Sequence, residues 1–573
     1  MQQRYWAHCR SDPTFYDRPE ARDDRPGDRY DGSAAVPDGW REVLDPTWRH
    51  LAPPRTRLPD QGWKIHVSAL LDNAERVLAA VAAHCVATGT PFKHLRSRRV
   101  LLSGNAKDAD RASSGKFVTV YPRDDADLAG LLAGLAPLLA GEQGPRILSD
   151  LRIGDGPLHV RYGGFRHLWC DDTDGARVPA VRRPDGALVP DRRLPRFVVP
   201  DWVDVPGCLV PHRDATVTGG SALPFTVTSA VRFSNAGGIY RAVPGPGTPA
   251  AGLGGTVVLK EARPDAGWDA SGRDAVARLA HEHAMLRRLS GIPGLPRSGE
   301  IVVAGGHHFL PLETMPGSTL STWVARNLPA QDHDAAAGAG YARRATAVAD
   351  RIDAVVAAVH ARGIAIRDLN PDNVLVDDTD DIDDTDGTVR VSLVDFEVAG
   401  DLDDRDGHGL GTPGFRLPGR PAGRAADDHA RAVLRLWMFH PTAPLLEVSR
   451  APLAGWIDHA RSRFALGSRW SDRMARDLGV TGEPAGAGAL GPGLVAGILG
   501  SATPDRRDRL FPGDIAQFDV DGLCFGHGAA GVLHALRVAG ADPRPAHEAW
   551  LLDALARYEP DRAGLWLGAP GIA

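Results

Sequence analysis

The sequence has few cysteines and no long apolar run, and both shortages exclude classes of protein. Its five cysteines are scattered over 573 residues without a C-x-x-C pair, which gives no metal-ligand spacing and suits a reducing cytosol. No apolar segment is long enough to span a membrane, and the N-terminus lacks the apolar run of a signal peptide. We therefore expect a cytoplasmic protein without a membrane span.

An excess of charge of either sign is also missing. The net charge of −6 argues against a broad nucleic-acid-binding surface, so no nucleic-acid partner is expected. Apolar residues make up 43% and charged residues 24%, which are ordinary globular values. At about 150 residues per domain, the length predicts three or four domains, each large enough for its own core.

The segment I-A-I-R-D-L-N-P-D-N-V-L, residues 364–375, carries the strongest chemical signal. It places Asp368 five residues before Asn373, and Asp395 follows after a strand-like run. Phosphoryl transfer needs one carboxylate to orient an attacking hydroxyl, and an Asn and an Asp to hold magnesium against the phosphates. A polar turn after a helix would explain a lone Arg-Asp pair, but it does not explain the whole spacing.

A lysine upstream extends this pattern. Lys260 ends the apolar strand-like segment 256–261, from which it could reach the phosphates of a nucleotide if a helix carboxylate holds it. Glu282 lies on an amphipathic segment at a suitable distance. Taken alone, Lys260 reads as a surface charge at a strand end. The chain order reverses that interpretation: Lys260, Glu282, Asp368, Asn373, Asp395.

The loop expected to cover the phosphates is the least typical part. It lacks a full G-x-G-x-x-G, although Gly237 and Gly238 would let backbone N–H groups approach phosphate oxygens. Glu397 stands where protein kinases usually have the Gly after Asp-Phe, and Ile366 stands where they usually have His. With these departures, residues 225–505 resemble the protein kinase fold.

This resemblance implies ATP or GTP and Mg²⁺ as cofactors. Asp368 would be the catalytic base or orienting residue, and Asn373 and Asp395 would hold Mg²⁺. Lys260 would pair with Glu282. The alternative is a pseudokinase, but residues of the required type stand at all five polar positions of the pattern. The preference for ATP or GTP stays open.

The N-terminal third carries a second set of polar motifs. Lys64 and His66 lie two residues apart in the strand-like segment G-W-K-I-H-V-S, so they share one face. Lys93 follows in P-F-K-H-L and Lys116 in S-G-K-F-V-T-V-Y-P. Each motif alone is ordinary. Together with S-D-L-R and V-R-Y-G-G-F-R further on, they resemble the phosphothreonine lyase family, which removes phosphate by β-elimination.

The chemistry of that family accounts for the residue types. A Cα–H beside an amide is a very weak acid, so its removal needs a lysine of depressed pKa and nearby cations. The leaving phosphate needs a proton and arginines to bind it. The resemblance implies His66 as the acid and Lys93 as the base. Candidates for phosphate and carbonyl binding are Lys64, Arg111, Lys116, Arg152 and Arg161.

Local patterns predict elements around these motifs. Apolar residues from Leu70 to Cys85 have helical spacing that ends near Gly89. Strands are expected at residues 99–102, 117–121 and 159–162. The acidic insert 377–386, which lies between two strands, is expected to be a solvated hairpin loop. The predicted division is an α+β domain at 1–205, a linker at 206–224, a bilobal kinase-like domain at 225–505 and a C-terminal part at 510–573.

The C-terminal part contains G-L-x-x-G twice, starting at Gly522 and Gly564. The recurrence is compatible with an α/α repeat and equally with two unrelated glycine-rich loops. It resembles the start of a lanthionine cyclase toroid. Two repeats cannot close a ring, so we expect an incomplete cyclase-like domain. The zinc ligands found in some cyclases cannot be assigned.

Lyase-like, kinase-like and cyclase-like segments in this order resemble a class III or class IV lanthipeptide synthetase. The resemblance implies a ribosomally made precursor peptide, whose Ser and Thr are phosphorylated and then dehydrated to dehydroalanine and dehydrobutyrine, ahead of cysteine cyclisation. One alternative is a signalling Ser/Thr protein kinase with an N-terminal regulatory domain. A non-catalytic scaffold is another. The sequence leaves class III and class IV open.

Overall fold

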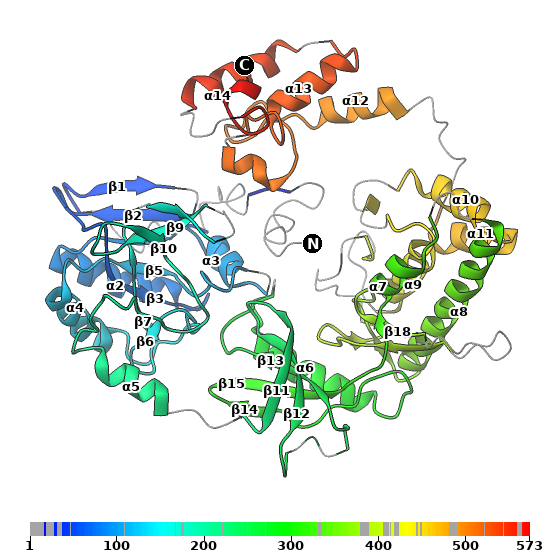
Figure 1. The fold of residues 1–573 in the computed structure, drawn as a ribbon, viewed down its shortest axis with the longest axis horizontal. Coiled ribbons are helices and arrows are strands. Elements are labelled where there is room, and N and C mark those ends of the chain that lie inside the picture. Colours follow the sequence, from blue (N-terminus) through cyan, green and yellow to red (C-terminus); the bar gives the residue numbers. More distant parts are fainter. Residues whose placement is uncertain are drawn as a thin grey trace.

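The computed structural model confirms a multidomain chain of mixed helices and sheets. In Figure 1 its parts follow one another around the view, from the blue and cyan N-terminal domain through a green sheet and yellow-green helices to the red C-terminal helices. Among the described residues, no helix is both long and apolar enough to cross a membrane. The structure describes residues 16–18, 28–30, 37–45, 47–107, 109–166, 168–173, 177–218, 223–248, 250, 252–269, 271–330, 334–378, 389–404, 412, 414–416, 423–442, 445–446, 450–480, 490–520, 522–542, 544–558 and 564–572.

The first domain is built on a seven-stranded sheet with strand order β1-β2-β4-β5-β3-β7-β6. All of its neighbouring strands are antiparallel. A smaller sheet has the order β10-β9-β8. The elements are β1 (Arg41–Leu44), β2 (Trp48–Ala52), β3 (Gln61–Val67), α2 (Ala74–Thr88), β4 (Phe92–Leu95), α3 (Arg98–Asn105), β5 (Val118–Val120), α4 (Asp125–Leu138), β6 (Leu151–Arg152), β7 (Leu158–Gly164), β8 (Trp169–Asp171), β9 (Arg177–Arg182), β10 (Leu188–Pro190) and α5 (Val210–Thr218).

Register divides the large sheet into an apolar face and a polar face, because directly paired residues point to the same side. One row of partners is buried in the core with α2 and α4: Leu51, Phe92, Val120, Ile65, Val160 and Leu151. The neighbouring row is polar and runs across the same six strands: His50, Lys93, Thr119, His66, His159 and Arg152. The fold therefore collects widely separated polar residues on one face.

Most of the local predictions for this domain are confirmed. Helix α2 ends at Gly89, whose positive φ of 62° is typical of a helix-ending glycine. The expected strands appear as β5 and β7. The strand predicted at residues 99–102 is wrong, because these residues lie in α3. The Oγ of Ser97 accepts a hydrogen bond from the Val100 N–H and caps this helix.

The predicted linker contains ordered structure. Its residues include α5, and Leu209 is fully buried in the core of the first domain. Gly219 and Gly220 of the same segment lie outside the described residues.

The next part is a five-stranded antiparallel sheet with strand order β11-β12-β13-β15-β14. Helix α6 packs against it through Leu279, Met285 and Leu286. Asp274 caps the helix, since its carboxylate accepts from the Ala277 N–H at 2.8 Å. The elements are β11 (Phe225–Phe233), β12 (Gly238–Pro244), β13 (Val257–Ala262), α6 (Ala275–Arg288), β14 (Val302–Ala304) and β15 (His307–Glu313).

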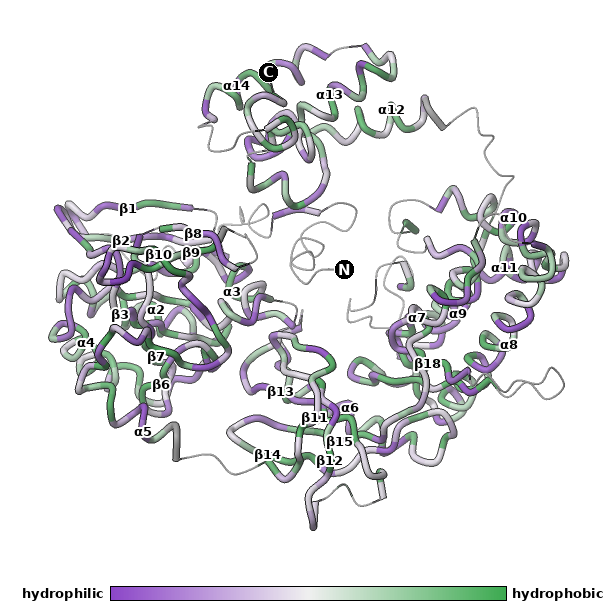
Figure 2. The backbone as a smooth tube through the Cα atoms, in the orientation of Figure 1, coloured by the Kyte–Doolittle hydropathy of each residue, from purple (hydrophilic) through white to green (hydrophobic). Residues whose placement is uncertain are grey.

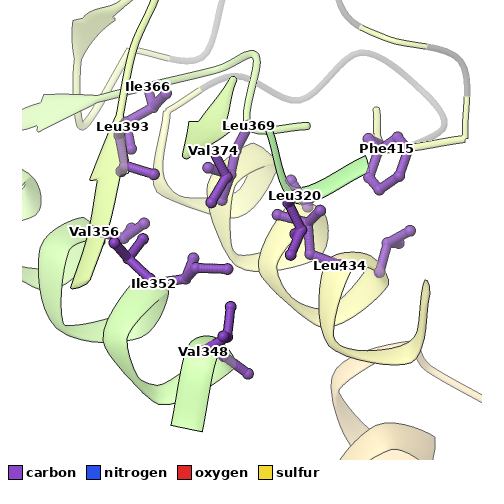
Figure 3. Close-up of a cluster of buried hydrophobic side chains, with 14 of the residues drawn as sticks. Leu320, Val348, Ile352, Val356, Ile366, Leu369, Val374, Leu393, Phe415 and Leu434 are labelled. Carbon is purple, nitrogen blue, oxygen red and sulfur yellow. The ribbon is translucent and has the colours of Figure 1, made fainter. Parts of the chain in front are cut away.

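A helical part follows, and its core is continuous with α6. Along α8 and α9, hydrophobic and hydrophilic segments alternate, as expected for helices with one buried face (Figure 2). Figure 3 shows Ile366, Leu369, Val374 and Leu393 in one buried cluster with Val356 of α8 and Leu434 of α9. The elements are β16 (Ser318–Thr319), α7 (Leu320–Asn327), α8 (Ala335–His360), β17 (Ile364–Ala365), β18 (Val374–Asp377), β19 (Arg390–Leu393), β20 (Gly400–Asp401), α9 (Arg424–Trp437), α10 (Leu453–Arg463) and α11 (Ser468–Asp477).

The strands on either side of the acidic insert pair with each other. β18 and β19 are antiparallel, with Asp377 opposite Arg390. This pairing matches the hairpin expected there. Residues 379–388 of the insert lie outside the described residues.

The C-terminal part forms a separate apolar cluster. Helix α12 packs into this cluster through Val495, Ile498 and Leu499, although the predicted boundary placed it in the preceding domain. The two G-L-x-x-G loops meet, because the Gly526 N–H donates to the Trp566 carbonyl at 2.8 Å. The elements are α12 (Leu490–Gly500), the 3₁₀ helix η5 (Ile515–Val520), α13 (Ala529–Val538), α14 (Pro545–Arg557) and the 3₁₀ helix η6 (Ala569–Gly571).

Candidate functional site

The polar face of the first sheet contains a buried histidine–carboxylate pair. Nδ1 of His66 on β3 lies 2.5 Å from Oδ2 of Asp150, and both side chains are buried. The hydroxyl of Ser149 donates to the other oxygen of Asp150 at 2.7 Å. Since Asp150 engages Nδ1, the imidazole orientation is fixed and Nε2 is the nitrogen left to meet a ligand.

Burial sets the protonation of this pair. It lowers the pKa of His66 to about 3, and the attraction of Asp150 offsets only part of this effect. Burial opposes ionisation of Asp150 too, but His66, Lys116 and Ser149 together hold the pKa of that carboxyl below its usual range. At neutral pH the pair therefore consists of a neutral imidazole and a carboxylate.

Three lysines with lowered pKa surround this pair. Burial lowers the pKa of Lys64 to about 7, with Arg161 and Lys93 contributing and Asp191 opposing. Burial also lowers the pKa of Lys93 to about 8, and Asp45 opposes this shift. Lys116 has a pKa of about 8, again mainly because of burial. A neutral amine is thus accessible near neutral pH, as base chemistry requires.

Aromatic rings form the walls beside two of these lysines. Nζ of Lys93 lies 4.2 Å from the ring centroid of Trp48. Nζ of Lys64 lies 5.8 Å from the ring centroid of Phe165 and 6.0 Å from that of Tyr121. We call Lys64, His66, Lys93, Lys116, Asp150 and Arg161 the His66 cluster.

The structure separates the arginines predicted to bind phosphate. Arg161 lies in the His66 cluster, where it is paired with Asp191. The guanidinium of Arg152 donates instead to the carbonyls of Asp155 and Gly156. Arg111 lies against the second sheet, 5.1 Å from the ring centroid of Phe233 and 3.8 Å from Glu261. The structure therefore brings only Arg161 of the three to the cluster.

Sequence reasoning missed three charged residues of this site. Asp150 stands in the S-D-L-R segment, but a carboxylate was not expected among phosphate-binding cations. Asp191 and Arg193 act on the lysines from the loop after β10. That loop contains no motif, so only the fold places its charges at the sheet.

The second cluster lies between the five-stranded sheet and the helical part. Nζ of Lys260 on β13 lies 2.7 Å from Oε2 of Glu282 on α6 and 2.8 Å from Oδ1 of Asp395. Burial disfavours the ammonium, but Asp395 and Glu282 outweigh it and raise the pKa of Lys260. The other oxygen of Glu282 accepts from the Phe396 N–H at 3.2 Å, which ties α6 to the strand end after β19.

Asp368 and Asn373 lie on the loop between β17 and β18. The Asn373 amide donates to the Asp368 carbonyl at 3.0 Å and to its carboxylate at 3.3 Å. The N–H and hydroxyl of Thr412 donate to the same carboxylate at 3.1 Å and 3.0 Å. Burial and the charge of Asp395 raise the pKa of Asp368. We call Lys260, Glu282, Asp368, Asn373 and Asp395 the Lys260 cluster.

A buried aspartate on α9 fixes this loop. The carboxylate of Asp427 accepts from the N–H groups of Ile366 and Arg367 at 2.8 Å and 2.7 Å. It also lies 2.8 Å from Nε2 of His360. Arg367 has a positive φ of 68°, which is costly for a non-glycine residue and persists only where the surroundings impose it. Asp427 lies about sixty residues away in sequence, so no local motif reveals it.

The glycine loop between β11 and β12 is a tight turn. The Ser234 N–H donates to the Gly237 carbonyl at 2.8 Å. A Cβ at Gly237 would lie 2.1 Å from the Glu261 carbonyl, so only glycine fits there. The buried side chain of Asn235 donates to the carbonyls of Asn105 and Ala106 in the first domain, at 3.1 Å and 3.0 Å. The loop is therefore anchored to the first domain.

The donor types of the Lys260 cluster suit a hard cation. The Asn373 nitrogen faces Asp368, which directs the amide oxygen to the opposite side, and Asp395 supplies carboxylate oxygens. Amide and carboxylate oxygens are the ligands that Mg²⁺ takes beside nucleotide phosphates. Within the described ranges, no group of three or more His, Cys, Asp or Glu could hold a metal ion by itself.

Two partly buried clusters of charged side chains, each built on its own sheet, characterise this multidomain α+β chain. Residues 29–219 match the family described as RamC, N-terminal domain. The chain is 44% identical to the probable SapB synthase of Streptomyces coelicolor, over 96% of this chain and 64% of that protein. It is also 30% identical to the serine/threonine-protein kinase PkaA of the same organism, over 32% of this chain and 31% of that kinase.

The chain is thus similar to a synthase over most of its length and to a serine/threonine-protein kinase over about a third of it. The chain spans about two thirds of the length of the SapB synthase that it matches.

Proposed function

We propose that this chain dehydrates Ser and Thr residues of a ribosomally made precursor peptide in two steps, phosphorylation and elimination, ahead of cysteine cyclisation. The observation that carries the proposal is the pairing, in one chain, of the Lys260 cluster with three lysines of lowered pKa around His66 and Asp150. The first cluster would install a phosphate and the second would remove it.

In the first step, Asp368 orients the attacking hydroxyl and accepts its proton. The new bond joins the peptide oxygen to the γ-phosphorus of ATP or GTP, and the bond from that phosphorus to the bridging oxygen breaks. Lys260, held by Glu282, would contact the α- and β-phosphates. Asn373 and Asp395 would hold Mg²⁺, which would supply positive charge beside the phosphates. The partial match to a serine/threonine-protein kinase supports this assignment.

In the second step, the neutral amine of Lys93 removes the Cα proton of the phosphorylated residue. The electron pair forms the Cα=Cβ bond, and the Cβ–O bond to phosphate breaks. Lys64 stabilises the negative charge that develops on the carbonyl oxygen of this residue, while Lys116 and Arg161 hold the phosphate. Phosphorylation converts hydroxide, a poor leaving group, into a good one.

His66 would protonate the departing phosphate. Because its pKa is low, His66 is neutral until the substrate binds. A phosphate dianion beside Nε2 would favour the imidazolium and raise the pKa of His66, so that the ring takes up a proton from solvent and can pass it to the leaving phosphate. Asp150 holds the ring in place on the Nδ1 side.

The alternative, a signalling Ser/Thr kinase with a regulatory N-terminal domain, predicts a stable phosphorylated product. It gives no role to three partly buried lysines of lowered pKa. Mass spectrometry of a precursor peptide incubated with the chain, nucleotide and Mg²⁺ separates the two functions. We expect products that have lost water. Phosphopeptide as the only end product would favour the signalling kinase, and an unchanged peptide would contradict both.

A further inference from the structure

Lysine is rare in this chain, and its placement is selective. Only five of the 66 lysines and arginines are lysine: Lys64, Lys93, Lys107, Lys116 and Lys260. Ion pairs elsewhere on the surface use arginine, for example Arg76 with Glu142 and Arg288 with Asp401. Four of the lysines belong to the two clusters described above. Lys107 is the remaining one, and no motif assigned it a role.

The first domain places Lys107 beside the Lys260 cluster. Nζ of Lys107 is ion-paired with Oε1 of Glu397, and one third of its side chain is exposed. Arg278 of α6 lies 3.5 Å from the other oxygen of Glu397. Glu397 comes two residues after Asp395. Burial disfavours the Lys107 ammonium, but Glu397 and Asp395 outweigh it and raise its pKa.

Backbone contacts hold Lys107 in this position from both sides. Its N–H donates to the Trp268 carbonyl at 3.3 Å, and its carbonyl accepts from the Asn235 N–H at 3.1 Å. Both partners belong to the second part of the chain. Ala106 and Trp268 form a parallel bridge next to these bonds. Backbone hydrogen bonds between the two domains therefore fix the position of Lys107.

We propose that Lys107 is a positioning residue of the nucleotide site, through which the first domain fixes Glu397 and the preceding magnesium-binding Asp395. Four side chains hold the three consecutive residues 395–397. Glu282 accepts from the Phe396 N–H, Lys260 is paired with Asp395, and Lys107 and Arg278 are paired with Glu397. Glu397 stands where protein kinases usually have a glycine, and its two carboxylate oxygens are paired with one cation from each domain. The inference rests on the proposed function of the Lys260 cluster.

A lysine suits this place better than an arginine. Its ammonium is a compact charge on a flexible stem, whereas a guanidinium needs a planar, forked partner. Arg278 already occupies the other oxygen of Glu397. The compact group can also act on Asp368, whose pKa Lys107 helps to lower against the effect of burial.

Calorimetric titration of the full chain with adenylyl imidodiphosphate tests the proposal. The variants are Lys107→Met, Glu397→Gln and their combination. In Mg²⁺, Lys107→Met should bind the nucleotide about tenfold more weakly and need more Mg²⁺ for half-saturation. In EDTA, its affinity should equal that of the wild type, because the defect acts through the metal ligand. The double variant should be no worse than either single variant, and Lys107→Arg should be intermediate.

Arg288→Met is the matched control, because it removes an arginine paired to Asp401 of the same segment at 3.2 Å without facing Asp395. It should bind as the wild type does. Equal Mg²⁺ dependence in Lys107→Met and wild type would overturn the inference while leaving the proposed function intact. If Lys107→Met does not fold, Glu397→Gln tests the same pair from its other side. A wild-type chain that binds no nucleotide would overturn both.

Discussion

Nδ1 of His66 lies 2.5 Å from Oδ2 of Asp150, within a sheet face that also holds lysines of lowered pKa. A carboxylate among cations that bind phosphate looks unfavourable at first. Its position behind the imidazole explains it, because it orients the ring and stabilises the imidazolium that forms when phosphate binds.

Replacing that carboxylate should impair elimination and spare phosphorylation. Asp150→Asn keeps the shape but removes the charge, so we expect dehydration of a synthetic phosphopeptide to slow by about 10²–10⁴-fold. Quantitative mass spectrometry of the alkene product measures this rate. Ser149→Ala, which removes only the neutral hydrogen bond to Asp150, is the matched variant and should lose far less. Equal rates for Asp150→Asn and wild type would show that Asp150 is not needed.

The pH dependence of elimination should report a lysine base. The pKa of Lys93 is about 8, and only the neutral amine can accept the Cα proton. The rate on a preformed phosphopeptide should therefore rise on the acid limb, as Lys93 becomes neutral, and fall on the alkaline limb, where His66 loses its proton. Stopped assays across this range measure both limbs. A rate that falls over the whole range as the pH rises would contradict a lysine base.

Thr412 should affect how the rate of phosphorylation depends on pH in the acidic range. Its N–H and hydroxyl donate to Oδ1 of Asp368, and the hydroxyl bond lowers a pKa that burial otherwise raises. In Thr412→Val the pKa of Asp368 should rise further, so the acidic limb of the rate profile should move to higher pH. Thr412→Ser retains the hydroxyl and should keep the wild-type profile. An unshifted limb in Thr412→Val would show that this bond does not tune Asp368.

Asp427 should be important for stability as well as activity. Removing its carboxylate leaves the N–H groups of Ile366 and Arg367 without their partner in a buried place. Asp427→Ala should therefore lower the free energy of unfolding of this part by about 3 kcal/mol. Urea unfolding followed by tryptophan fluorescence measures the change. A decrease below about 1 kcal/mol would mean that other contacts hold the loop.

Short-range patterns predicted the residues that meet through regular elements. The shared face of Lys64 and His66 follows from the two-residue period of β3, and the Lys260–Glu282 pair follows from a strand and the next helix. Register across the three strands β4, β5 and β3 then places Lys93 in the same row as His66. No pattern in one strand could give that register.

Long-range contacts were not predictable from the sequence. Arg111 stands near Lys116 in the chain, but it lies against Phe233 because the intervening segment turns towards the second sheet. Asp427 and Asp191 act from distant segments without a motif. The strand predicted at 99–102 is wrong because a short apolar run fits a helix as well as a strand, and here Ser97 caps a helix.

The most direct test of the two-step account is the peptide made by Lys93→Ala. Given precursor, nucleotide and Mg²⁺, this variant should accumulate peptide that carries phosphate and has lost no water. Asp368→Ala should leave the peptide unmodified, and wild type should give the dehydrated product. Mass spectrometry distinguishes the three masses. Normal dehydration by Lys93→Ala would contradict the assignment of elimination to the His66 cluster.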